Sequence, residues 1–264
     1  MNRKGWMTMP SWDARQYLQF ERERTRPVQD LLARLPEDGI GRILDIGCGP
    51  GNSTERLAAR YPGAAIIGID TSPDMLAAAK KRLPNAAFRL CDAGRELPSL
   101  GGGFDLVFSN ACLQWVPDHA RVLPDMMRLL RAGGRLAVQI PVNREEPIHR
   151  ILEGLASGKK WGGRLGSPRI FHTLTPDAYH DLLTTLSGGF DMWRTTYYHV
   201  LPTREAIIDW YRGTGLRPYL EALSPDERPA FEADVLEEVR QAYPARRNGE
   251  VLFPFPRLFF TAVR

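Results

Sequence analysis

The chain has 264 residues, of which 43% are hydrophobic and 25% are charged, and its formal net charge at pH 7 is +4. This composition is typical of a globular protein and excludes a disordered or fibrous chain. The basic residues are spread along the chain and mostly have acidic neighbours, so the small positive excess does not predict nucleic-acid binding. The length suits one large α/β unit with an insertion.

Membrane and metal partners are also not expected. No run of eighteen apolar residues is present, so the sequence predicts no membrane span. The three cysteines, Cys48, Cys91 and Cys112, lie far apart and form no C-x-x-C pair. Such sparse and odd cysteine usage favours a reducing, cytoplasmic location and argues against a zinc site.

The first part of the chain, residues 13–35, has apolar residues at helical spacing. We expect Pro27 to end one helix or to begin the next, because proline lacks the backbone donor that a helix interior needs. We predict that residues 1–40 form a helical lid that excludes water from a site. A helix packed on a sheet is the alternative.

Strand-like and helix-like segments alternate from residue 42 to residue 141. Apolar runs that are typical of buried parallel strands occupy residues 42–47, 63–70, 86–92, 104–110 and 133–141. This alternation predicts an α/β fold with a doubly wound, mostly parallel, Rossmann-like sheet. The carboxyl ends of its strands share one edge, where ligands bind. We assign residues 41–141 to a cofactor-binding core.

The pattern changes after Pro141. Two more strands, at residues 190–202 and 250–264, bring the predicted sheet to seven strands, and helical segments at 203–244 lie between them. Pro254 and Pro256 favour an edge or strand-entry position in the last strand, because a proline cannot donate to a strand ladder. We expect residues 142–264 to complete the sheet and to add a helical cap over the substrate.

Glycines at alternate positions follow the first strand, in the sequence LDIGCGPGN. A dinucleotide site requires the spacing G-x-G-x-x-G, whereas the sixth position here is Asn52. Asp45 precedes the first glycine by two residues. Its carboxylate would repel a pyrophosphate at roughly 6 Å by about 3 kcal/mol, at an effective dielectric near 20. The same carboxylate would attract a cation, which favours S-adenosylmethionine, with its ammonium and sulfonium groups.

Polar residues also end the next three strands. Asp70 is placed to accept both ribose hydroxyls, Asp92 to meet the adenine edge, and Asn110 to face the reacting group. Each is individually as compatible with a turn as with a ligand, but four strand ends in register favour a binding site. The predicted cofactor-binding residues are Asp45, Gly47, Gly49, Gly51, Asp70, Thr71, Met75, Asp92, Ala93, Asn110 and Gln114.

With these residues the sequence resembles the class I S-adenosylmethionine-dependent methyltransferases. The segments WDARQYLQFERERTRP, SNACLQWVPDH, WRTTYYHVLPT, IIDWYRGTGLRPYL and LFPFPRLFF further resemble the trans-aconitate 2-methyltransferase family within that class. The resemblance is weakest over residues 144–185. It implies the methyltransferase fold, S-adenosylmethionine as cofactor, and esterification of a carboxylate of trans-aconitate or a similar small polycarboxylate.

That reaction requires no general base, because a carboxylic acid with a pKa near 4 is already ionised at pH 7. The protein must instead hold and desolvate an anion, a task that suits the guanidinium fork of arginine. A structural ion pair is the alternative for each arginine, and a hydrogen-bonded strand residue is the alternative for His199. The proposed substrate-binding residues are Tyr17, Arg26, Trp115, Arg194, Tyr197, His199, Arg217 and Arg257.

Two other functions stay open at this point. One is a methyltransferase for another small acid or for an acyl-carrier substrate. The other is a dinucleotide-dependent oxidoreductase. A non-catalytic nucleic-acid-binding protein is less compatible with the sequence, because no basic and aromatic array is present.

Overall fold

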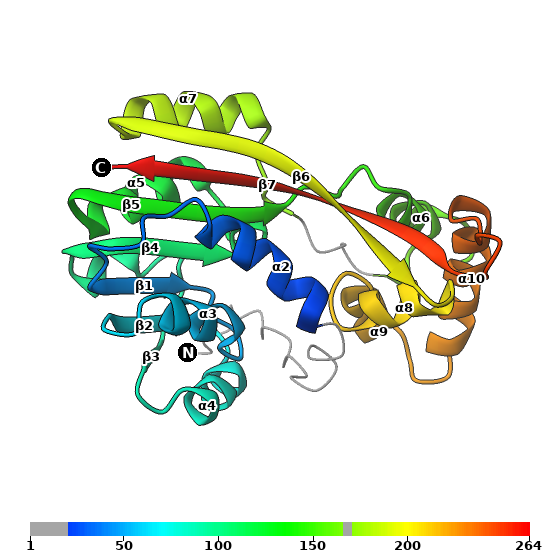
Figure 1. The fold of residues 1–264 in the computed structure, drawn as a ribbon. Coiled ribbons are helices and arrows are strands. Elements are labelled where there is room, and N and C mark those ends of the chain that lie inside the picture. The colour runs from blue at the N-terminus through cyan, green and yellow to red at the C-terminus, as the bar shows by residue number, and fades with distance from the viewer. Residues whose placement is uncertain (1–20, 166–170) are drawn as a thin grey trace.

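A computed structural model describes residues 21–165 and 171–264 (Figure 1). These residues form one seven-stranded sheet in the order β3-β2-β1-β4-β5-β7-β6. Strands β1 to β5 are parallel, and β7 runs antiparallel between β5 and β6. The predicted doubly wound α/β sheet is therefore confirmed. The strands are β1 (Arg42–Ile46), β2 (Ala65–Asp70), β3 (Ala87–Leu90), β4 (Phe104–Asn110), β5 (Leu130–Pro141), β6 (Gly189–Leu201) and β7 (Val251–Val263).

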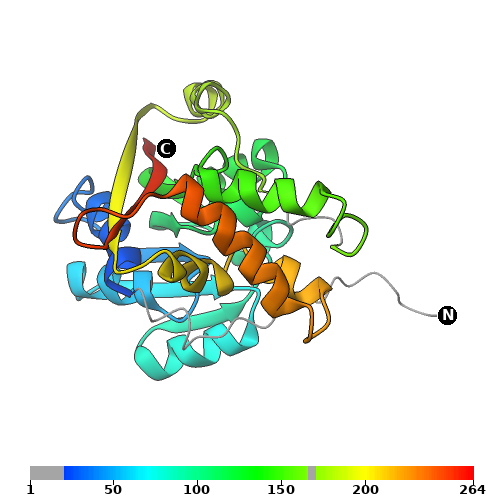
Figure 2. The ribbon, with the colours of Figure 1, turned by 90° about the vertical axis from the view of Figure 1, so that its right-hand side faces the viewer.

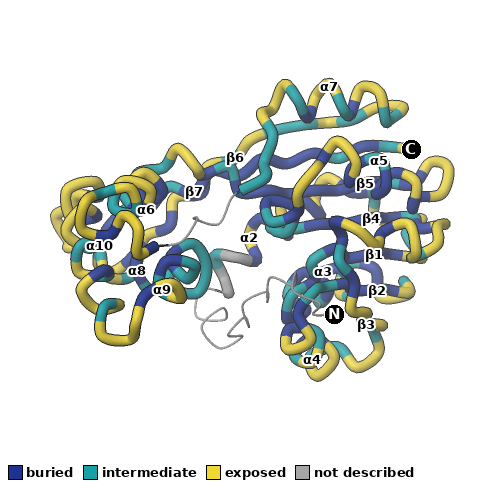
Figure 3. The backbone as a smooth tube through the Cα atoms, turned by 180° about the vertical axis from the view of Figure 1, so that it is seen from behind, coloured by how far each residue is buried: buried dark blue, intermediate teal, exposed yellow. Residues whose placement is uncertain are grey.

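Helices cover both faces of this sheet, and alternate residues of a strand face opposite layers. Helices α2 (Glu21–Leu32) and α3 (Asn52–Arg60) pack on one face. Helices α5 (His119–Leu129) and α7 (Pro176–Leu186) pack on the other face. Buried residues follow the central strands, whereas the outer turns of α7 are exposed (Figure 3). Three short elements complete this part: α4 (Pro73–Arg82), η1 (Leu97–Leu100) and η2 (Leu113–Trp115).

Helix α2 continues through Pro27, so the expectation that this proline divides the segment is wrong. Leu31 of α2 is fully buried in a cluster that includes Leu57 and Phe259. The burial of this apolar face stabilises the helix despite the missing proline donor. This part of the predicted lid thus packs on the sheet. Residues 1–20, the rest of the predicted lid, lie outside the described residues.

Strand β7 is an inner strand, so of the two positions predicted from its prolines the edge position is wrong, whereas Pro254 and Pro256 do lie near the entry of the strand. Strand β5 pairs with β7 only from Arg257 to Val263, and β7 extends beyond the end of β5. The carbonyl oxygen of Pro256 accepts a hydrogen bond from the backbone N–H of Val142. The backbone of Pro256 therefore faces the β5 side, where no strand partner is left, and the ladder with β6 is not interrupted.

The long strands β6 and β7 extend past the sheet and carry a separate helical unit. Helix α6 (Pro147–Ser157) follows β5, whereas α8 (Glu205–Arg212), α9 (Arg217–Ala222) and α10 (Arg228–Ala242) lie between β6 and β7. Figure 2 views the molecule from this end, where α10 packs against α6. The unit has a hydrophobic core of its own, which includes Leu152, Trp210, Phe231, Val239 and Phe253. In the described part of the chain, no helix has the length and apolar composition that a membrane span requires.

Candidate functional site

In the glycine loop between β1 and α3, two glycines are closely packed against other residues and the third is not. Gly47, Gly49 and Gly51 all have positive φ angles, of 71°, 54° and 92°. A Cβ atom on Gly47 would lie 2.2 Å from the Sγ of Cys112, and one on Gly51 would lie 3.3 Å from Ala79. A Cβ atom on Gly49 would meet no described atom within 4 Å. The backbone at Gly49 is therefore accessible to a ligand.

Asp45 lies directly beneath this loop and is fully buried. Its Oδ2 accepts hydrogen bonds from Ser53 Oγ at 2.9 Å and from Thr54 Oγ1 at 2.7 Å. Its Oδ1 has no hydrogen-bond partner among the described residues. Burial raises the pKa of Asp45 to about 6, because desolvation penalises the carboxylate. A cation above the loop would stabilise this charge, whereas a pyrophosphate would oppose it.

Asp70 links the glycine loop to the beginning of α4. Its Oδ2 accepts from the backbone N–H of Gly49 at 3.0 Å, and its Oδ1 accepts from the N–H of Ser72 at 2.9 Å. Burial raises the pKa of Asp70 as well. Because a carboxylate oxygen can accept two hydrogen bonds, each oxygen keeps acceptor capacity for a ligand hydroxyl.

The other predicted cofactor residues follow the ends of β2 and β3. Thr71 comes directly after β2 and is half-buried, and Met75 is buried in the first turn of α4. Asp92 and Ala93 follow β3, where Asp92 Oδ1 accepts from the N–H of Gly94 at 2.8 Å. The predicted residues thus lie along the carboxyl edge of β1 to β3. Their donor and acceptor set, together with the open backbone at Gly49, fits S-adenosylmethionine.

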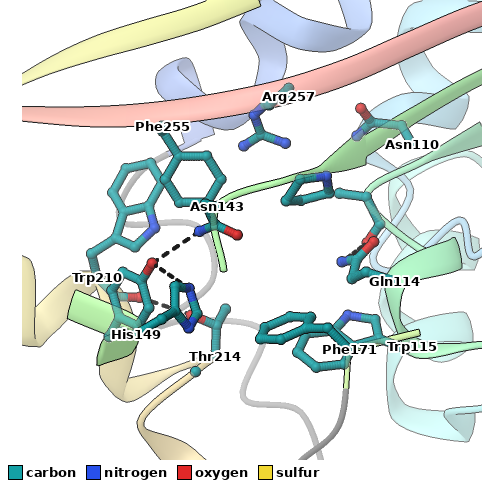
Figure 4. Close-up of a pocket in the computed structure, with 14 residues that line it drawn as sticks. Asn110, Gln114, Trp115, Asn143, His149, Phe171, Trp210, Thr214, Phe255 and Arg257 are labelled. Carbon is teal, nitrogen blue, oxygen red and sulfur yellow. Dashed lines mark hydrogen bonds between the residues drawn. The ribbon is translucent and has the colours of Figure 1, made fainter. Parts of the chain in front are cut away.

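A pocket lies where the carboxyl ends of β4 and β5 meet the helical unit (Figure 4). Asn110, Gln114 and Trp115 line its sheet side. Ala111, also in this wall, has a positive φ of 52°, a strained backbone of the kind that concentrates at functional sites. The opposite walls come from segments far along the chain, and they include Asn143, His149, Trp210, Tyr211, Phe255 and Arg257.

Arg257 of β7 is the one Lys or Arg in the described wall of this pocket. It is 4% exposed and donates from Nη1 to Gln139 Oε1 of β5 at 3.0 Å. Its guanidinium lies 4.6 Å from the centre of the Phe255 ring. A guanidinium in a pocket wall is a charged donor whose fork matches the geometry of a carboxylate. The pocket is therefore suited to an anionic ligand.

Two buried amide oxygens lie on the sheet side of the pocket. Asn110 Oδ1 and Gln114 Oε1 have no hydrogen-bond partner in the part of the chain that the structure describes. Beside them, the Trp115 ring packs against Phe171 with 4.8 Å between ring centres. Buried acceptors of this kind are costly unless a donor reaches them. They are placed to accept from a cationic, hydrogen-bond-donating group of a ligand.

Several predicted substrate residues are not brought to the described wall of the pocket. Arg194 is exposed on β6, and Tyr197 on the same strand donates its hydroxyl to Asp30 of α2. His199 is buried against the Trp210 ring at 4.7 Å. The opposite orientation of Arg194 and Tyr197 follows from the period-two alternation of a strand.

Two further candidates lie elsewhere, and one is not described. Arg217 forms an ion pair with Glu221 at 2.6 Å, the structural alternative to a substrate contact. Arg26 of α2 is exposed, with its guanidinium 5.2 Å from the centre of the Tyr197 ring. Tyr17 lies outside the described residues. Trp115 and Arg257 are thus the two proposed substrate residues that the described pocket brings together.

Sequence reasoning missed the pocket residues of the helical unit. Asn143 comes two residues after β5 and follows the same strand-end pattern as Asp70, Asp92 and Asn110. His149 and Tyr211 lie inside helices, where no local pattern marks them. Their position in the wall comes from the packing of α6 and α8.

Comparisons with known proteins agree with this geometry. A family model described as a methyltransferase domain matches residues 43–134. The chain is 47% identical over 257 residues to the trans-aconitate 2-methyltransferase of Azoarcus sp. (strain BH72), with coverage of 97% of this chain and 100% of the relative. It is 48% identical over 258 residues to the trans-aconitate 2-methyltransferase of Methylobacterium nodulans, with coverage of 97% and 99%.

Solved structures resemble the fold at lower sequence identity. The YcgJ protein from Bacillus subtilis aligns with a TM-score of 0.60 at 16% identity, over 90% of this chain and 97% of that chain. The phosphoethanolamine N-methyltransferase 2 of Haemonchus contortus, solved with phosphomonomethylethanolamine and S-adenosylhomocysteine, aligns with a TM-score of 0.53 at 19% identity, over 90% of this chain and 52% of that chain. At these identities the likeness concerns the fold.

Proposed function

Because the chain belongs to the trans-aconitate 2-methyltransferase family, we propose that it transfers a methyl group from S-adenosylmethionine to a carboxylate of trans-aconitate or a similar small polycarboxylate. The chain is a methyltransferase that depends on S-adenosylmethionine, so the oxidoreductase alternative is wrong. The single observation that supports the substrate class is the buried Arg257 in a pocket at the carboxyl edge of the sheet.

The cofactor would be held by the residues along β1 to β3. Asp45 beneath the loop favours a cationic group, the open backbone at Gly49 allows close approach, and Asp70 offers acceptors for ribose hydroxyls. When bound, S-adenosylmethionine supplies an electrophilic methyl group on a positively charged sulfur. Asn110 and Gln114 then stand between this edge and the substrate pocket.

The residues of the pocket orient an anion and exclude water from it. Arg257 offers a charged donor, and the rings of Trp115, Phe171 and Phe255 form apolar walls. In such a water-poor site the attraction between opposite charges is stronger than in bulk solvent. Holding the reacting groups together can lower the barrier by up to about 7–11 kcal/mol.

We propose that no side chain acts as a general base. Burial lowers the pKa of His149 to about 4, so this imidazole is a weak base at neutral pH. Burial raises the pKa of Tyr211, which keeps its hydroxyl protonated. The substrate carboxylate is ionised without help, because its ordinary pKa lies near 4. We place this reaction in the cytoplasm, without a nucleic-acid or membrane partner; Cys48, Cys91 and Cys112 are free thiols.

The test is transfer of a labelled methyl group to a panel of acceptors: trans-aconitate, cis-aconitate, citrate, itaconate and a malonyl carrier protein. We expect the fastest transfer to trans-aconitate and a product that mild base hydrolyses, as it does esters. A base-stable product would contradict carboxylate methylation. Faster transfer to the malonyl carrier protein would show that the preferred substrate is a carrier-bound acyl group and not a free polycarboxylate.

A further inference from the structure

Three polar side chains from different elements form a buried chain in the pocket wall. Asn143 follows β5, His149 lies in α6 and Tyr211 lies in α8. Asn143 Nδ2 donates to the Tyr211 hydroxyl at 3.0 Å, and the same hydroxyl lies 3.0 Å from His149 Nε2. The three residues are 5%, 6% and 3% exposed. Figure 4 shows that the amide oxygen of Asn143 points into the pocket, on the side of Arg257.

The chain is electrically neutral, because burial disfavours the charged forms of both His149 and Tyr211. The single hydroxyl proton of Tyr211 therefore sets the direction of both hydrogen bonds. Asn143 donates to this hydroxyl, and His149 Nε2 is the one acceptor that the described residues offer to the hydroxyl proton. The hydroxyl therefore donates to Nε2, and the imidazole proton is on Nδ1. In this direction Asn143 offers the pocket an acceptor.

The opposite direction uses the same three groups. His149 with its proton on Nε2 donates to the Tyr211 oxygen, the Tyr211 hydroxyl donates to Asn143 Oδ1, and the Asn143 amide group presents its two N–H donors to the pocket. The change requires a half-turn of the amide, rotation of the Tyr211 O–H bond toward Asn143, and a tautomer change of the imidazole, in which Nδ1 gives its proton to solvent water and Nε2 receives one from solvent water. No net charge enters the wall.

A carboxylate only accepts hydrogen bonds, so an anion beside Asn143 favours the second direction. Arg257 can meet one carboxylate, whereas a polycarboxylate brings at least one more into the same pocket. We propose that Asn143 recognises a second carboxylate of the substrate, and that Tyr211 and His149 allow its amide to turn from acceptor to donor when this substrate binds. The inference rests on the proposed function, because it requires a substrate with two or more carboxylates.

The first test is the isosteric variant Asn143→Asp, which places an anion opposite the second carboxylate. We expect the KM for trans-aconitate to rise about 100-fold, with a change in kcat of less than about threefold and unchanged affinity for S-adenosylhomocysteine. The matched control is Asn85→Asp, the same substitution at an exposed residue in the turn before β3, outside the pocket. We expect this control to stay within about twofold of the wild type.

The second test follows the tautomer of His149 by ¹⁵N NMR on protein labelled at histidine, with S-adenosylhomocysteine bound. The signal is assigned with His149→Gln. We expect the proton to be on Nδ1 without acid, to move to Nε2 with trans-aconitate, and to stay on Nδ1 with the monocarboxylate crotonate. In Tyr211→Phe, which keeps the ring but removes the hydroxyl, trans-aconitate should no longer move the proton.

The outcomes separate this inference from the proposed function. A wild-type enzyme that does not methylate trans-aconitate would contradict the proposed function. A wild-type enzyme that does, together with an unchanged KM in Asn143→Asp or an unchanged His149 tautomer, would overturn only the role assigned to Asn143.

Discussion

The two halves of the site hold their polar groups in different ways. Along β1 to β3, Asp70 accepts from the backbone N–H groups of Gly49, three residues after the end of β1, and Ser72, two residues after the end of β2. In the pocket, Asn143, which follows β5, donates its amide to Tyr211 of α8, and Arg257 of β7 donates to Gln139 of β5.

This difference has a consequence for substitutions. At the carboxyl edge of β1 to β3, which we call the cofactor edge, the donors are backbone N–H groups, which a side-chain substitution does not remove. We therefore expect cofactor binding to be altered there by substitutions that change the backbone conformation or the charge. The pocket depends on individual side chains, so single truncations should affect it strongly. We therefore expect changes at the cofactor edge to alter cofactor affinity and changes in the pocket to alter acid recognition.

The largest effect is expected from Arg257→Met. Loss of a buried charged donor should lower kcat/KM for trans-aconitate about 100-fold, equivalent to about 3 kcal/mol, while calorimetry finds unchanged affinity for S-adenosylhomocysteine. Arg194→Met is the matched control, since Arg194 is exposed on β6. Equal losses in the two variants would show that the charge of Arg257 has no specific role.

The second comparison is between Gly49→Ala and Gly47→Ala. At Gly49 the new methyl group meets no described atom within 4 Å, so it should lower cofactor affinity roughly 30-fold by occupying ligand space, with about 1–2 kcal/mol of backbone strain. At Gly47 the methyl group overlaps Cys112 and should lower the melting temperature more. Undiminished cofactor binding by Gly49→Ala would mean that the ligand does not approach this backbone.

A smaller effect is expected from Asp70→Asn. An amide replaces one of two acceptor oxygens and places donors against the N–H of Gly49 or Ser72. We expect cofactor affinity to fall about tenfold, the effect of losing a charged acceptor, with kcat at saturating cofactor nearly unchanged. An affinity equal to that of the wild type would mean that the ribose is bound elsewhere.

The smallest effect concerns pH. With the pKa of Asp45 at about 6 without cofactor, a cation that binds only above the ionised form should bind about fourfold more weakly at pH 5.5 than at pH 7.5. The raised pKa also means that Asp45 favours folding most at low pH and that this contribution is lost as the pH rises through about 6. Calorimetric titration of Asp45→Asn should show a flatter dependence of affinity on pH; an equally steep one would assign the effect to another group.

The cofactor edge could be predicted from the sequence because its residues stand at the ends of successive strands. The strand, the three glycines and the acidic strand ends lie in short segments whose spacing fixes their geometry, and the described structure places them along one edge. Pro27 and the prolines of β7 were misleading for different reasons. Burial of an apolar face stabilises α2 through Pro27, and β5 ends beside Pro256, so that this proline interrupts no ladder.

The pocket could be predicted only in part. Arg257 and Trp115 were among the candidates, but no local signal distinguishes Arg257 from Arg194, since both lie in strands rich in aromatic residues. The sequence does argue against a substrate contact for Arg217, because Glu221 four residues later is an ion-pair partner on the same helix face. His149 and Tyr211 enter the wall through the packing of α6 and α8 in the core of the helical unit.

The antiparallel pairing of β6 with β7 has a consequence for how the segment between them can evolve. Leu201, the last residue of β6, pairs directly with Val251, the first residue of β7, so the segment 202–250 leaves and rejoins the sheet at adjacent points. A lineage could exchange this whole segment for another without altering the register of any strand. The part of the pocket wall that Trp210, Tyr211 and Thr214 form could then diversify while Arg257 and the machinery for the methyl donor are inherited intact.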